Sequence, residues 1–102
     1  MVNYSQSIIY KICCRNTDIK EIYIGSTTNF RLRKCHHKSD CNNIKNKSYN
    51  YRVYKFIREN GGWDNFDMVQ IEQYNATDKH SLHARERHWI EELKANLNGH
   101  IP

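Results

Sequence analysis

The sequence has little proline and glycine, with one proline and four glycines in 102 residues. Linkers and low-complexity segments are rich in these two residues, so their scarcity excludes a long flexible connection between domains. The sequence also lacks any apolar run near the roughly 20 residues that a membrane-spanning helix needs. We therefore expect a single domain over residues 1–102, with one core of modest size.

The start of the chain has no charged region ahead of its first apolar residues, as a secretory signal peptide would have. We therefore expect an intracellular protein, and in that reducing environment disulfide bonds are rare. The run from Cys35 through His36 and His37 to Cys41 contains zinc-ligating residue types but lacks the CxxC pairs of a structural zinc site. Cys13 and Cys14 are interpreted as small residues of a strand.

Acidic residues are outnumbered, with 11 Asp and Glu against 16 Lys and Arg and a net charge of +5. Such a surplus in a small domain favours an anionic partner, most commonly nucleic acid. The alternative is that the charge only keeps the domain soluble, and composition alone does not decide between the two.

Hydrophobic periodicity predicts three strands and three helices. Turn residues at 15–18 join the first two strands into a hairpin, polar residues at 40–47 form a loop, and oxygens at 26–28 and 75–78 cap two helices. The expected order is β-β-α-α-β-α, an α+β domain with a small, mainly antiparallel sheet flanked by helices. The predicted strands are 7–14, 21–25 and 66–74, and the predicted helices are 29–38, 48–60 and 79–93.

The last predicted helix carries a carboxylate on its apolar stripe. Positions 82, 86, 90, 93 and 97 lie along one face, and Glu86 is the charged residue among them. A carboxylate on a buried face must be paired, protonated or bound to a cation. The alternative is that Glu86 lies at the rim and pairs with Arg85 or Arg87.

The first predicted helix is strongly basic. Arg33 and His37 are spaced i, i+4 and therefore project together. Arg31, Lys34 and His36 point in other directions and are candidates for contacts with DNA phosphates. The alternative is an ordinary solvated helix face.

Two strand tyrosines complete the set of candidates. Tyr10 and Tyr23 each follow an isoleucine, in the two strands of the predicted hairpin. Tyrosines in strands usually serve in the core or in cross-strand packing. Taken singly, none of these residues indicates an activity.

Taken together, the residues resemble the GIY-YIG nuclease superfamily. Ile8-Ile9-Tyr10 and Tyr23-Ile24-Gly25, twelve residues apart, are similar to the two motifs that name it. Arg33, His37, Glu86 and Asn98 follow in the family's order, and the likeness covers about residues 7–99. Within this superfamily, the sequence resembles homing-endonuclease-type catalytic domains of phages and large DNA viruses. Ile8 replaces the glycine of the first motif, and the segment around 48–50 lacks a histidine that some homing relatives carry.

The resemblance implies a metal-dependent DNA endonuclease. Glu86 would hold one divalent metal, Mg²⁺ or Mn²⁺, and a tyrosine, Tyr10 or Tyr23, would activate the attacking water. Arg33 would neutralise the phosphate, His37 would relay or accept a proton, and Asn98 would anchor a tyrosine or a phosphate. DNA is the implied partner, with an additional DNA-binding domain or protein partner as a further possibility.

Two other functions stay open at this point. One is a catalytically inactive nucleic-acid-binding module with the same fold, and the other is a structure-specific nuclease for flaps or branches that needs a partner. Binding alone does not require a carboxylate close to a phosphate, so the intact set of tyrosines, arginine and glutamate favours an enzyme.

Overall fold

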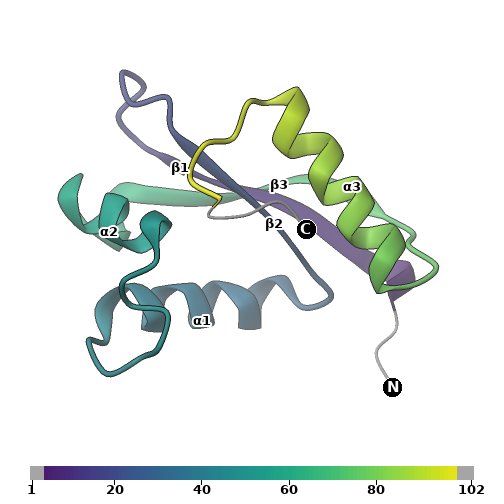
Figure 1. The fold of residues 1–102 in the computed structure, drawn as a ribbon, viewed down its shortest axis with the longest axis horizontal. Helices are drawn as coiled ribbons and strands as arrows, with labels where there is room; N and C mark the ends of the chain where they lie inside the picture. Colours follow the sequence, from purple (N-terminus) through teal and green to yellow (C-terminus); the bar gives the residue numbers. More distant parts are fainter. Residues whose placement is uncertain (1–3, 99–102) are drawn as a thin grey trace.

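The computed structural model describes residues 4–98, which form one antiparallel sheet with helices on both of its faces (Figure 1). The sheet order is β2-β1-β3, so β1 is central and β2 is an edge strand. The predicted fold class and the order β-β-α-α-β-α are confirmed. The strands are Ser7–Cys14 (β1), Ile22–Thr27 (β2) and Phe66–Tyr74 (β3), the helices are Phe30–Asn42 (α1), Arg52–Glu59 (α2) and Lys79–Glu92 (α3), and short 3-10 helices span Tyr4–Gln6 and Trp63–Asn65.

The alternation of β1 divides the core into two parts. Tyr10 and Ile12 belong to a cluster with residues of α2 and β3, whereas Ile9 belongs to a second cluster with Leu82 and Ile90 of α3. Successive strand residues point to opposite faces of a sheet, so α1 and α2 cover one face and α3 covers the other. All four cysteines are free thiols, and no helix within residues 4–98 is long and apolar enough to cross a membrane.

The first two predicted strands and the first predicted helix differ from the structure at their ends. β1 matches its prediction, but β2 begins one residue later and continues past Gly25 because its ladder with β1 runs on to the pair Ile8 and Thr27. The cap of α1 is Asn29, whose side chain accepts from the backbone of Leu32, and not a residue of 26–28. The helix continues to Asn42, so the predicted loop at 40–47 was wrong in its first three residues.

The other two helices are shorter than predicted. α2 begins at Arg52 and ends at Glu59, because residues 45–51 form a series of turns. α3 begins after the cap Asp78, as the sequence indicated, and ends at Glu92. Lys94 has a φ of +54°, which turns the chain away from the helix axis. Leu93 is consequently 39% exposed, so the predicted apolar stripe ends at Ile90.

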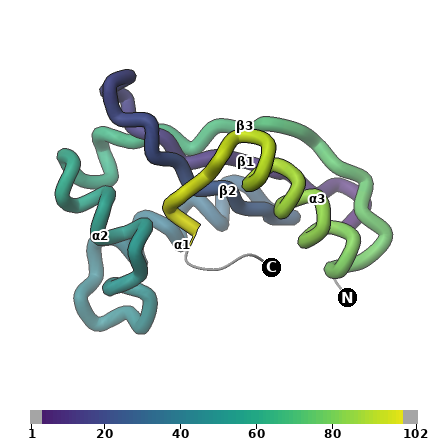
Figure 2. The backbone as a smooth tube through the Cα atoms, turned by 45° about the horizontal axis from the view of Figure 1, so that its top comes forward, coloured from purple at the N-terminus to yellow at the C-terminus, as the bar shows by residue number. Residues whose placement is uncertain are grey.

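The segment after α3 runs alongside β2 and covers its outer edge (Figure 2). The backbone of Leu97 donates to the carbonyl of Ile22 at 3.1 Å. The Asn98 side chain then accepts from the Ile24 N–H at 3.0 Å and donates to the Ile24 carbonyl at 2.7 Å. Unpaired groups of an edge strand are thereby satisfied, and the position of β2 is fixed.

Candidate active site

The two tyrosines lie side by side because of the register between β1 and β2. Tyr10 is opposite Gly25, and Ile12 is opposite Tyr23. Directly opposed residues of an antiparallel pair share a face, so Tyr10 and Tyr23 are diagonal neighbours on the face covered by α1. A Cβ at Gly25 would collide with the Tyr10 hydroxyl and ring. The second motif therefore needs a glycine at position 25, because the phenol of Tyr10 lies against its Cα.

His37 lies beneath the two tyrosines and is fully buried. Its Nε2 is 2.6 Å from the Tyr10 hydroxyl, and its Nδ1 is 2.7 Å from the Tyr54 hydroxyl. The Trp63 ring stacks on the imidazole at 6.3 Å between centroids, and the Tyr23 ring meets it edge-on. Burial, reinforced by the charge of Arg33, lowers the pKa of His37 to about 3, so the imidazole is neutral at physiological pH.

Arg33 lies one turn before His37 on α1, and its positive charge acts on the hydroxyls of both Tyr10 and Tyr23. Burial raises the pKa of both phenols above the ordinary value, and the positive charge of Arg33 opposes that effect. The i, i+4 spacing on α1, from which the sequence predicted that the two side chains project together, thus brings a cation and a neutral imidazole to the same pair of phenols.

Glu86 is buried on α3, with 9% of its surface exposed. Its Oε2 accepts a hydrogen bond from the Ser26 hydroxyl at 2.8 Å, which ties the carboxylate to the end of β2. The arginines on either side of it bond elsewhere, since Arg85 pairs with Glu72 and Arg87 pairs with Glu91. The predicted alternative of a rim position is contradicted by the burial of Glu86, and the ion pairs described for the two arginines go to other carboxylates.

A cavity of about 500 Å³ lies at the β2 edge of the sheet. Tyr23 and Arg33 line it from one face of the sheet, and Glu86 lines it from the other. Side chains of both faces can meet there because no fourth strand continues the sheet beyond β2 in the part of the chain that the structure describes. Tyr10 and His37 do not line the cavity and lie behind it in the core.

Asn98 also lines the cavity, but its amide is engaged by the backbone of β2. The two hydrogen bonds go to Ile24, the residue after Tyr23. Asn98 therefore holds in place the strand that carries Tyr23, and neither bond goes to a tyrosine hydroxyl.

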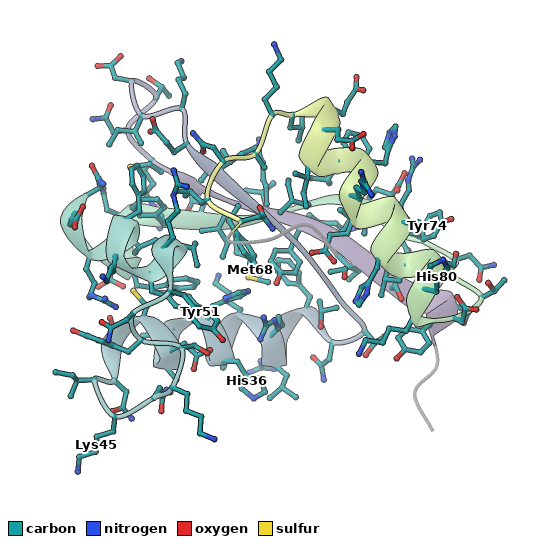
Figure 3. All side chains as sticks on the ribbon, viewed as in Figure 1. His36, Lys45, Tyr51, Met68, Tyr74 and His80 are labelled. Atoms are coloured by element: carbon teal, nitrogen blue, oxygen red, sulfur yellow. The ribbon has the colours of Figure 1, made fainter. Side chains whose placement is uncertain are left out.

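The three predicted DNA-binding residues lie on the surface of α1. Arg31, Lys34 and His36 are exposed, and none of them lines the cavity. His36 lies on the side of the helix away from the sheet (Figure 3). Their contact with DNA stays a prediction.

Three further residues belong to the site and were missed from the sequence. Asp40 lies seven residues after Arg33 on the same face of α1, Tyr54 is on α2, and His83 is three residues before Glu86 on α3. Helical spacing offered a signal for Asp40 and His83. Tyr54 gave none, because its neighbours Val53 and Ile57 make it resemble an ordinary core residue.

The residues around the cavity suit a hard divalent cation. The described residues contain no cluster of three or more His, Cys, Asp or Glu side chains that could enclose a metal. A single carboxylate held by Ser26 beside an open cavity fits Mg²⁺, which keeps several of its own waters. Zinc ligation by the Cys35 to Cys41 run is not supported, because both ring nitrogens of His37 bond tyrosine hydroxyls and Cys35 is exposed.

Comparison with known proteins places this geometry in a family. The family model of the GIY-YIG catalytic domain matches residues 6–99. The solved catalytic domain of the homing endonuclease I-TevI is similar to the chain with a TM-score of 0.71 and 26% sequence identity, over 92% of this chain and 95% of that one. Comparison with curated proteins gives no significant match. Since the family model covers more than nine-tenths of the sequence, the chain belongs to the GIY-YIG family of nucleases.

Proposed function

We propose that the chain is a divalent-metal-dependent endonuclease that hydrolyses phosphodiester bonds of DNA. The observation that carries this proposal is the meeting of a phenol, a guanidinium and a buried carboxylate, those of Tyr23, Arg33 and Glu86, around one cavity. The net charge of +5 suits an anionic polymer as substrate. Family membership and the likeness to a homing endonuclease domain support the same activity.

Glu86 is the residue that would hold the metal, Mg²⁺ or Mn²⁺. A divalent cation bound there supplies positive charge for the phosphate and for the departing oxygen. The chain's own contribution is a carboxylate that is already oriented by Ser26 and largely removed from bulk water. Placing the charged ligand in one fixed position lowers the reorganisation needed when substrate binds.

Tyr23 is the better candidate for the general base. It lines the cavity, whereas Tyr10 is fully buried and its hydroxyl bonds His37. A phenol ordinarily titrates near pH 10, so ionising half of it at pH 7 requires about 4 kcal/mol of preferential stabilisation of the phenolate. The positive charge of Arg33 stabilises the phenolate of Tyr23, whereas burial of the ring destabilises the phenolate.

Arg33 would bind the non-bridging oxygens of the phosphate. A planar guanidinium matches two phosphate oxygens with parallel N–H donors, which a lysine cannot do. The guanidinium lines the cavity together with Tyr23 before substrate arrives, and its charge acts on both phenols. The charge of Arg33 would therefore both bind the phosphate and lower the pKa of Tyr23, the proposed base.

The test is nicking of supercoiled plasmid DNA by the wild type and by Glu86→Gln, with Mg²⁺ and with EDTA. We expect the wild type to nick only with the metal, and Glu86→Gln to lose the activity while keeping salt-dependent DNA binding. Glu92→Gln is the matched control, since Glu92 lies on the exposed side of α3. Unchanged nicking by Glu86→Gln would overturn the metal assignment. Binding without cleavage by the wild type would indicate a binding module instead.

A further inference from the structure

A chain of hydrogen bonds runs from Tyr10 through the core to Asp40, and the charge of Arg33 acts on its Tyr10 end. Tyr10 bonds His37 at 2.6 Å, and His37 bonds Tyr54 at 2.7 Å. The Tyr54 hydroxyl then donates to Asp40 Oδ2 at 3.5 Å, the longest of these links. Four side chains from β1, α1 and α2 are therefore joined in one series.

The Asp40 end of this series determines the position of every proton in it. A carboxylate only accepts hydrogen bonds, so Tyr54 must give its proton to Asp40, and the Tyr54 oxygen accepts from Nδ1 of His37. Nε2 of the neutral imidazole is then an acceptor, so the Tyr10 proton must point to it, and the lone pairs of the Tyr10 oxygen are left to face the charge of Arg33.

His37 completes the series only as one tautomer. A neutral imidazole carries one N–H and one acceptor nitrogen, and here the N–H must be on Nδ1. The opposite tautomer would leave the Tyr10 proton and the Nδ1 lone pair without partners in a buried site, at a cost of about 1–3 kcal/mol for each group. No buried side-chain nitrogen or oxygen lacks a partner among residues 4–98, as this arrangement requires.

From this geometry we propose that Tyr54 is a positioning residue of the nuclease, which with Asp40 fixes His37 in the Nδ1-protonated form and so directs the Tyr10 oxygen to Arg33. The catalytic part of this statement rests on the proposed function, but the placement of the protons does not. Tyr54 acts on the phosphate site through His37 and Tyr10. Asp40 is held in turn by Asn46, whose amide donates to Oδ1 at 3.2 Å.

The proton on Nδ1 can be observed directly by two-bond ¹H–¹⁵N correlation NMR of the folded protein at neutral pH. We expect His37 as the Nδ1-protonated tautomer, with an Nδ1 proton that exchanges slowly with solvent. In Tyr54→Phe the Nδ1 proton should exchange much faster, since its acceptor is gone. An Nε2-protonated or doubly protonated His37 in the wild type would overturn the proposal.

Plasmid nicking by the same proteins tests the effect on catalysis. Tyr54→Phe should lower kcat about tenfold with little change in KM, because the ring and its packing remain. Tyr49→Phe is the matched control: its ring stacks on Arg58 at 3.6 Å and lies outside the series, so both kcat and the Nδ1 signal should stay as in the wild type.

A second variant covers the case in which Tyr54→Phe does not fold. Asp40→Asn weakens the acceptor at the end of the series, so it should also lower kcat, by less than tenfold because the amide oxygen still accepts. Unchanged kcat in both variants would overturn the positioning role. A wild-type protein that shows the expected tautomer but never cleaves DNA would overturn the proposed function and leave the proton arrangement standing.

Discussion

Tyr10 lies directly across the β1–β2 ladder from Gly25, and its hydroxyl occupies the space where a side chain at position 25 would begin. This contact by itself explains why position 25 is a glycine. Gly25→Ala should destabilise the fold by about 1–3 kcal/mol, as overpacking of a full core does. Urea unfolding measures the change.

A double-mutant cycle identifies the cause of that loss. Tyr10→Phe removes the hydroxyl that lies closest to position 25, so Gly25→Ala should cost less in the Tyr10→Phe background than in the wild type. Strictly additive costs would show that the hydroxyl is not the obstacle.

Tyr23 gives the proposed reaction a characteristic pH dependence. Burial raises its pKa above the ordinary value near 10, so the phenolate fraction, and with it the logarithm of kcat, should rise by about one per pH unit from pH 7 to 9. Tyr23→Phe should lower kcat by about 10²–10⁴-fold and abolish this rise. Single-turnover nicking at fixed Mg²⁺ gives the profile. A plateau below pH 8 in the wild type would argue against a tyrosine base.

Buried His37 should make the fold sensitive to acid. Its pKa is about 3 in the folded state against 6.5 when exposed, so between these values the unfolded chain binds a proton that the folded chain does not. Stability is therefore complete above pH 6.5 and decreases as the pH falls towards 3, by about 1.4 kcal/mol per unit from this group. His37→Gln should unfold with a correspondingly shallower pH dependence in urea titrations. If the free energy of unfolding depends equally on pH in the wild type and in His37→Gln, the lowered pKa of His37 is contradicted.

The exposed basic side chains of α1 should contribute to affinity and leave the chemistry intact. Removing both charges in Arg31→Gln/Lys34→Gln should weaken DNA binding and reduce the slope of log K against log salt by about 1.8, if each contacts one phosphate. Nicking at saturating DNA should keep the wild-type kcat, since neither residue lines the cavity. Lys20→Gln/Lys79→Gln removes the same charge elsewhere and is the matched control. An equal change in slope for the two pairs would indicate only a general effect of net charge.

Asn98 should contribute to the stability of β2 more than to the rate of the reaction. Asn98→Ala leaves the N–H and carbonyl of Ile24 without their amide partner, at a cost of about 1–3 kcal/mol in unfolding free energy. Asn96→Ala, at an exposed position of the same segment, should change stability by less than 0.5 kcal/mol. Loss of kcat in Asn98→Ala with full stability would instead indicate a direct role in the reaction.

The sequence by itself determined the parts of the molecule that depend on local pattern. The apolar and aromatic residues of 7–14 and 66–74 predicted β1 and β3 with their observed bounds, and Asp78 was recognisable as a helix cap. Helical spacing placed Arg33 with His37 and put Glu86 on the buried stripe of α3. These features follow from periods of two and 3.6 residues, which the order of residues contains directly.

Only the tertiary structure decided which side chains meet. Whether Glu86 pairs with a neighbouring arginine or with Ser26 depends on how α3 lies on β2, and the partner of Asn98 depends on the path of the chain after Lys94. The hydroxyl of Tyr54 reaches His37 only through the packing of α2 against α1. Such contacts join residues 17 to 74 positions apart, and local periodicity carries no information about distances of that kind.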